Sequence, residues 1–168
     1  MQIYTERRLD VRSYQQEDMD FLADMLADPQ MVRYIGEGTP KNKDEAKEFL
    51  QWIYRTYEHG EDMGFKVLIR TEDNVPVGHA GLVPRELDGK QEIEIGYWIA
   101  REYWGNGYAT EAAKAFLDYG HYQLGIKRFI AIIQPGNMAS RQVAQKIGMQ
   151  LEKRMVLAGQ EVYVYAKD

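Results

Sequence analysis

Short stretches of alternating apolar and polar residues predict a series of β-strands along the chain. The first covers residues 9–13, where Leu9 and Val11 alternate with charged residues in the period-two pattern of a half-buried strand. Apolar segments rich in β-branched residues predict further strands at 65–70, 75–83, 93–100, 128–133, 151–156 and 161–166. The polar separators at 72–74 and 88–90 are turn-like, so we expect the second, third and fourth strands to form an antiparallel meander.

An apolar period of 3.6 residues predicts four helices between these strands. Their expected ranges are 19–28, 44–59, about 109–120 and about 138–147. Asp18 is a candidate N-cap for the first helix, which should end at Asp28 because Pro29 restricts the residue before it. Two glycines, a proline and polar residues at 36–43 predict a loop before the second helix.

Composition bounds the class of protein. The chain has 168 residues, 45% of them hydrophobic and 28% charged, which is ordinary for one globular domain. No repeat or linker divides it, so residues 1–168 should form a single domain. The absence of cysteine excludes disulfides and thiolate sites.

Charge and hydropathy limit the expected partners. The net charge of −5 has the wrong sign for broad attraction to nucleic acid or to an anionic membrane. It favours a cationic acceptor such as an amine, although a charge of this size also simply keeps a small protein soluble. No apolar run approaches the ~20 residues of a membrane span, and the charged start lacks a signal-peptide core. We therefore expect a cytoplasmic protein with neither membrane nor nucleic acid as partner.

A glycine-bearing loop between a strand and a helix carries the clearest chemical signal. The strand ending Ile95 to Ala100 leads into Trp104-Gly105-Asn106-Gly107-Tyr108-Ala109-Thr110. Glycines let a ligand approach the main chain, and the free N–H groups of a helix start attract anions. A pyrophosphate is the expected ligand. No Gly-Lys-Ser/Thr follows, as a P-loop requires, and Thr110 stands where a Rossmann fingerprint needs a third glycine.

This segment resembles the acetyl-CoA-binding motif of the GNAT (Gcn5-related N-acetyltransferase) superfamily, Gln/Arg-x-x-Gly-x-Gly/Ala. Gly107 and Ala109 occupy its small positions, while Trp104 departs from the usual first residue. The longer string from Ile95 to Ala112 is similar to the branch that contains ribosomal-protein N-terminal acetyltransferases.

A second block carries the same resemblance. Asn137 follows a strand and precedes a helix that ends in Lys146-Ile147-Gly148-Met149. Asparagine is also a favoured N-cap, and in the family both roles coexist. The opening Thr5-Glu6-Arg7 and the turn Tyr34-Ile35-Gly36 look like the same branch.

The resemblance implies an α/β (α+β) fold with one GNAT-like domain, in which about four helices flank a mixed, mostly antiparallel sheet of six to seven strands. It implies direct attack of an amine on acetyl-CoA, with no metal, and a backbone N–H near Tyr97 to Ile99 that holds the oxyanion. The implied cofactor-binding residues are Tyr97, Trp98, Ile99, Trp104, Gly105, Asn106, Gly107, Tyr108, Ala109, Thr110 and Asn137.

The catalytic candidates are Ser140 and Glu94. Many relatives place a tyrosine seven residues after the asparagine, where this chain has Ala144, but the resembling branch proposes a serine at the position of Ser140 as the acid for the leaving thiolate. Glu94 should share a strand face with Gly96 and with Glu92. It is the best-placed carboxylate base, and ordered water is the alternative.

Several functional alternatives remain open. His59, His79 and His121 lie in no motif and are expected to be surface or packing residues. The acceptor amine could belong to a protein N-terminus, a polyamine, an aminoglycoside or a small metabolite, and the protein could be a monomer or a homodimer. A non-catalytic CoA-binding sensor or scaffold is the alternative to an enzyme.

Overall fold

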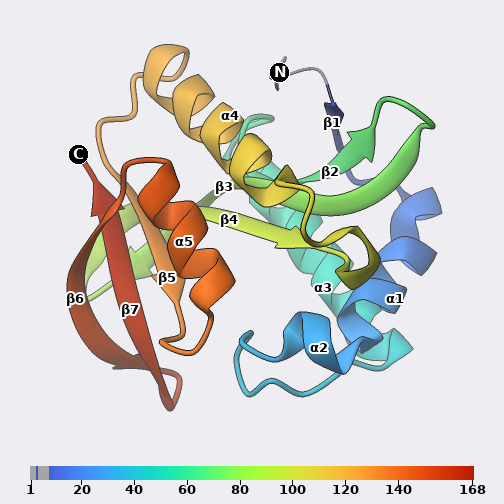
Figure 1. The fold of residues 1–168 in the computed structure, drawn as a ribbon, viewed down its shortest axis with the longest axis horizontal. Coiled ribbons are helices and arrows are strands. Elements are labelled where there is room, and N and C mark those ends of the chain that lie inside the picture. Colours follow the sequence, from blue (N-terminus) through green and yellow to red (C-terminus); the bar gives the residue numbers. More distant parts are fainter. Residues whose placement is uncertain (1–2, 4–7) are drawn as a thin grey trace.

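One twisted sheet contains every strand that the structure describes. The computed structural model describes Ile3 and residues 8–168, so the similarity at Thr5 to Arg7 lies outside the described residues. The strand order is β1-β2-β3-β4-β5-β7-β6 (Figure 1). The strands are β1 Leu9–Ser13, β2 Gly64–Arg70, β3 Val75–Leu87, β4 Lys90–Ile99, β5 Phe129–Ile133, β6 Gln150–Leu157 and β7 Gln160–Lys167.

Helices cover both faces of this sheet. They are α1 Met19–Ala27, α2 Pro29–Val32, α3 Lys43–Thr56, α4 Tyr108–Tyr122 and α5 Met138–Lys146, with short 3-10 turns at Gln16–Asp18, Tyr57–His59 and Arg101–Tyr103. Buried residues of α4 and α5 join one core cluster, and those of α1, α2 and α3 join the other. The predicted fold class, a mixed and mostly antiparallel sheet between helices, is confirmed.

The predicted meander is confirmed, but its second hairpin is longer than the pattern indicated. Strand β3 runs on to Leu87 and β4 begins at Lys90, because Asp88 and Gly89 alone make the turn. Both have positive φ, 52° and 75°, as a two-residue type I′ turn requires. Lys90, expected in the turn, is therefore the first residue of a strand.

Helix α2 was missed, and the predicted N-cap of α1 is at the expected residue but makes no side-chain cap bond. Asp28 ends α1 and then caps α2, since its Oδ1 accepts from the N–H of Gln30 at 3.0 Å. Asp18 stands at the N-cap position of α1 without a side-chain cap bond. Its carboxylate instead binds both Nη atoms of Arg12 at 2.7 and 2.8 Å and the N–H of Gln15.

The sheet is interrupted between β4 and β5. These two strands are parallel and pair at Glu94↔Ile130, whereas every other neighbouring pair in the described sheet is antiparallel. Beyond that pair the strands separate, β4 pointing toward α1 and β5 toward the lower end of the molecule (Figure 1). The split leaves backbone groups of both strands without a ladder partner.

Candidate functional site

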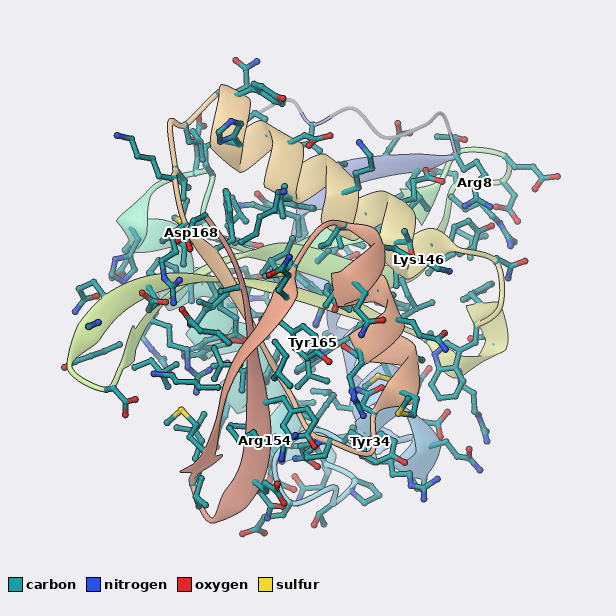
Figure 2. All side chains as sticks on the ribbon, turned by 60° about the vertical axis from the view of Figure 1, so that its left-hand side comes forward. Arg8, Tyr34, Lys146, Arg154, Tyr165 and Asp168 are labelled. Atoms are coloured by element: carbon teal, nitrogen blue, oxygen red, sulfur yellow. The ribbon has the colours of Figure 1, made fainter. Side chains whose placement is uncertain are left out.

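A cavity of about 770 Å³ occupies the gap between β4 and β5. The end of β4, the start of α4 and the start of α5 line it on one side, and the segment around α2 lines it on the other. Gln134 donates to the carbonyl of Gly36 at 2.7 Å, and the Tyr34 ring lies so close to Gly136 that a Cβ there would stand 2.8 Å from it. Figure 2 shows Tyr34 beneath α5, so the α2 segment closes this end of the cavity.

The backbone of β4 points into the gap at alternate residues. The N–H of Ala100 donates to Val77 on β3 at 2.9 Å, and hydrogen-bonded positions alternate along an antiparallel pair. The backbone N–H and C=O groups of Trp98 therefore point toward β3, whereas those of Tyr97 and Ile99 point into the gap. The carbonyl of Ile99 accepts from the Trp104 indole at 2.7 Å, which agrees with this direction.

The three residues expected near the oxyanion thus separate into two kinds. Tyr97 and Ile99 can offer backbone N–H groups to a ligand in the gap. Trp98 lines the cavity through its side chain, on the opposite face of the sheet.

The glycine loop, residues 104–107, ends in a helix start with unused donors. Gly105 and Gly107 have φ of +82° and +79°, which only glycine adopts without strain. Gly107 is the N-cap of α4 and has no side chain to cap it, and the first bond of the helix runs from Glu111 N–H to the Gly107 carbonyl. The N–H groups of Tyr108, Ala109 and Thr110 precede that bond, so they lack helical acceptors and form an anion site.

Asn106 stands apart from the other residues of this loop. Its amide donates to the carbonyl of Tyr103 at 2.9 Å, and it is absent from the cavity wall to which Trp104, Gly105 and Gly107 contribute. The side chain therefore holds the shape of the loop.

Arg8, which immediately precedes β1, contacts the loop on the side away from the cavity. Its Nη1 donates to the Asn106 carbonyl and its Nε to Glu111, both at 2.7 Å, and its guanidinium lies 4.7 Å from the centre of the Tyr108 ring. The Glu111 side chain is 5% exposed. No sequence signal indicated this contact, because about a hundred residues separate the partners.

Asn137 and Ser140 lie at the start of α5, and the structure adds the Tyr97 hydroxyl to them. The Asn137 side chain accepts from the N–H of Ser140 at 3.2 Å, so it caps the helix. Ser140 Oγ donates to the Tyr97 hydroxyl at 3.2 Å, and that hydroxyl donates to the Ser140 carbonyl at 2.9 Å. Burial raises the pKa of Tyr97 to about 12. Ala144 is fully buried in the core.

Glu94 lines the cavity from the opposite face of the sheet. Its side chain is 17% exposed, and Oε2 lies 2.9 Å from Nη1 of Arg85. Burial raises the pKa of Glu94 although the Arg85 charge lowers it. Glu92, expected on the same face, binds Arg128 instead and does not reach the cavity wall.

The three histidines lie outside the cavity wall. His59 and His121 are exposed. His79 is fully buried, with its ring centre 4.2 Å from that of Phe65 and 4.7 Å from that of Trp98, and its Nδ1 lies 2.6 Å from the Tyr14 hydroxyl. Burial lowers the pKa of His79 to about 3, so this neutral ring supports the aromatic wall of the cavity.

Comparison with known proteins agrees with this arrangement. Residues 8–150 match the family model described as the acetyltransferase (GNAT) domain. The uncharacterized protein YkkB of Bacillus subtilis is 34% identical over 95% of this chain and 92% of its own length. The uncharacterized N-acetyltransferase YnaD of the same species is 34% identical, over 96% and 94% of the two chains.

Solved structures have the same fold. A GNAT-family acetyltransferase from Bacillus anthracis superposes with a TM-score of 0.80 at 28% identity, covering 99% of this chain and 97% of that one. RimL, a ribosomal L7/L12 alpha-N-protein acetyltransferase solved with coenzyme A, superposes with a TM-score of 0.81 at 19% identity, covering 98% and 96%; at that identity the likeness concerns the fold alone.

The described part of the chain contains neither a membrane-spanning helix nor a metal site. Within Ile3 and residues 8–168, no helix has the length and apolar character to cross a membrane. The same residues contain no group of three or more His, Asp or Glu side chains placed to hold a metal ion.

Proposed function

Since this chain belongs to the acetyltransferase (GNAT) family of acyl-CoA N-acyltransferases, we propose that it transfers the acetyl group of acetyl-CoA to a primary amine within a ternary complex. The amine nitrogen forms a bond to the acetyl carbonyl carbon, the carbon–sulfur bond breaks, the amine loses a proton and the thiolate of CoA gains one. Acetyl-CoA supplies the activated acyl group, and the protein supplies position, charge stabilisation and proton acceptors and donors.

One observation carries this proposal: the gap between β4 and β5 joins an anion site to unpaired strand N–H groups inside a single cavity. The free donors of Tyr108, Ala109 and Thr110 suit a pyrophosphate. The gap-facing N–H and C=O groups of Tyr97 and Ile99 suit the amide-bearing arm that links a pyrophosphate to a thioester. These groups support CoA as the ligand of the gap.

The same N–H groups support the proposed stabilisation of the oxyanion. A donor fixed on a strand needs no reorganisation during the reaction, and such a donor typically contributes about 3 to 4 kcal/mol to the transition state. Tyr97 and Ile99 are the candidates because their donors face the gap, whereas Trp98 donates toward β3.

Ser140 is the proposed proton donor to the leaving thiolate. It lines the cavity at the start of α5, and its hydroxyl donates to Tyr97 at 3.2 Å, so in this scheme the Ser140 O–H turns from Tyr97 to the thiolate as CoA departs. Tyr97 acts through Ser140 in this scheme and is a positioning residue. Asn137 holds the turn that presents Ser140, in addition to its proposed contact with the pantetheine arm.

Glu94 is the proposed base, with ordered water as the alternative. Its raised pKa makes the carboxylate a better proton acceptor than an ordinary glutamate. Its location on the face opposite Ser140 supports a geometry in which amine and thioester approach each other through the gap.

A thiol-release assay with a panel of amines tests the proposal, together with calorimetric titration of CoA. A transferase binds CoA and releases free thiol only when amine and acetyl-CoA are both present. CoA binding with no amine-dependent thiol release would favour the sensor or scaffold alternative. Failure to bind CoA would contradict both.

A further inference from the structure

The side of the cavity that faces away from Ser140 lacks the net negative charge that the whole protein carries. We call this side the acceptor face; it contains Glu94, Arg85, Trp98 and Phe65 and lies toward α2. Among the described residues that line the whole cavity, the charged side chains are Arg33, Arg85 and Glu94, a formal sum of +1, although the chain carries −5. The cationic acceptor that the net charge favoured would find one carboxylate on this face, Glu94, which is already paired with Arg85.

Arg85 has donors that no residue of the described chain uses. Its Nη1 binds Glu94, but Nε is buried and has no acceptor among the described residues. Arg70 shows how an arginine Nε can bind a carboxylate. Its Nε and Nη2 donate to the two oxygens of Asp73 at 2.9 and 2.6 Å. A buried donor without a partner destabilises the protein. A carboxylate bound beside the guanidinium would satisfy it after a small rotation of the Arg85 side chain, which is 35% exposed.

The remaining wall of the acceptor face is apolar and aromatic. The rings of Phe65 and Trp98 have centres 5.3 Å apart, and Leu157 and Val162 of the β6–β7 hairpin also line the cavity. Such a wall suits an uncharged side chain of moderate size and gives no counter-charge to a second ammonium group.

We propose that the acceptor is an α-amino acid with an apolar side chain, an inference that rests on the proposed transferase function. Glu94 receives the amino group and Arg85 the carboxylate. Because the guanidinium and the carboxylate are joined by a contact of 2.9 Å, the pair suits a ligand whose amino and carboxylate groups are on the same or adjacent carbon atoms. The amine then loses its proton toward Glu94 and attacks the acetyl carbon, while the apolar side chain contacts Phe65 and Trp98.

Matched pairs of acceptors test this inference in the wild-type protein. The assay is thiol release with saturating acetyl-CoA, using L-leucine, L-methionine and L-phenylalanine, each against its carboxamide, with phenethylamine and spermidine as amines lacking the carboxylate. We expect kcat/KM for at least one acid to exceed that of its carboxamide by about tenfold or more, as a bidentate arginine contact allows. The carboxamides are less basic and have more neutral amine, so amine ionisation cannot produce this preference.

Variants of Arg85 assign the preference to its guanidinium. In Arg85→Gln the ratio of kcat/KM for the acid to that for its carboxamide should fall to about threefold or less. Arg85→Lys keeps the positive charge but lacks the paired guanidinium donors, so it should give an intermediate ratio. The dissociation constant of CoA should not change, because Arg85 lies on the face away from the glycine loop, and this measurement also shows that each variant is folded.

The outcomes separate this inference from the proposed function. Equal use of acids and carboxamides, preference for spermidine, or an undiminished ratio in Arg85→Gln would overturn the amino-acid assignment and leave a transferase with another acceptor. Thiol release with none of these amines or any other primary amine, despite CoA binding, would overturn both.

Discussion

Replacing Arg8 by alanine should weaken CoA binding by leaving a buried negative charge at the anion site. In the wild type Arg8 neutralises Glu111, whose side chain is 5% exposed and whose Oε2 already has no partner among the described residues. An unpaired carboxylate about 7 Å from a phosphate, little more than one helical turn, repels it by about 2 kcal/mol at an effective dielectric constant of about 20. That energy corresponds to roughly a thirtyfold increase in Kd.

The same change should also lower the stability of the protein. Losing a hydrogen bond to a charged group typically costs about 1.5 to 3 kcal/mol, and the lower end applies because the Arg8 side chain is 47% exposed. Urea unfolding measures this loss, so a folded variant can be distinguished from an unfolded one before binding is compared.

Calorimetry with CoA and with pantetheine, which lacks the pyrophosphate, distinguishes electrostatic repulsion of the pyrophosphate from a general disruption of the binding site. Arg8→Ala should weaken CoA and leave pantetheine unchanged, and adding Glu111→Gln should restore most of the CoA affinity. Lys114→Ala is the matched control, since it removes one positive charge from the ion pair with Asp118 at 3.0 Å on α4. Unchanged CoA affinity in Arg8→Ala, or an equal loss with pantetheine, would refute the reasoning.

Three further expectations concern the start of α5 and the buried histidine. Asn137→Asp should keep the melting temperature, because aspartate caps as well, but weaken CoA binding because aspartate has no amide N–H; a fall in stability with unchanged affinity would leave capping as the role of Asn137. Ser140→Ala should lower the pre-steady-state rate of acetyl transfer at least ~10-fold with Kd for CoA unchanged, since general-acid assistance is worth ~10²- to 10⁴-fold; a rate within about twofold of wild type would make water the donor. His79 stays neutral in the fold because its pKa is lowered to about 3, so the unfolded chain takes up a proton as pH falls below its ordinary pKa near 6.5 and stability should drop by ~2 kcal/mol between pH 7.5 and 5. Urea unfolding should show a weaker pH dependence in His79→Leu, and an identical one would exclude His79 as its source.

The local sequence was sufficient to predict the secondary structure wherever residues close together in the chain determine the backbone conformation. The strands and the four longer helices were predictable because apolar periodicity is a property of adjacent positions. The predicted element boundaries differed from the observed ones where turn or capping residues set the conformation. Asp88 and Gly89 alone form the turn between β3 and β4, and the Asp28 side chain caps a helix of only four residues, Pro29–Val32. Asp18 occupies the predicted N-cap position of α1, but its carboxylate makes no cap bond because Arg12, on the preceding strand, binds it.

The sequence by itself determined the glycine loop, the helix start that follows it and the family, since these depend on residues that are adjacent in the chain. Only the tertiary structure decided which N–H groups of β4 face the gap, that Arg8 braces a loop about a hundred residues away, and that the Tyr97 hydroxyl meets Ser140. It also placed Arg85 beside Glu94 on the acceptor face. The physical reason is that strand pairing and packing bring these groups together across the sheet, and no periodicity along the chain records which side chains meet there.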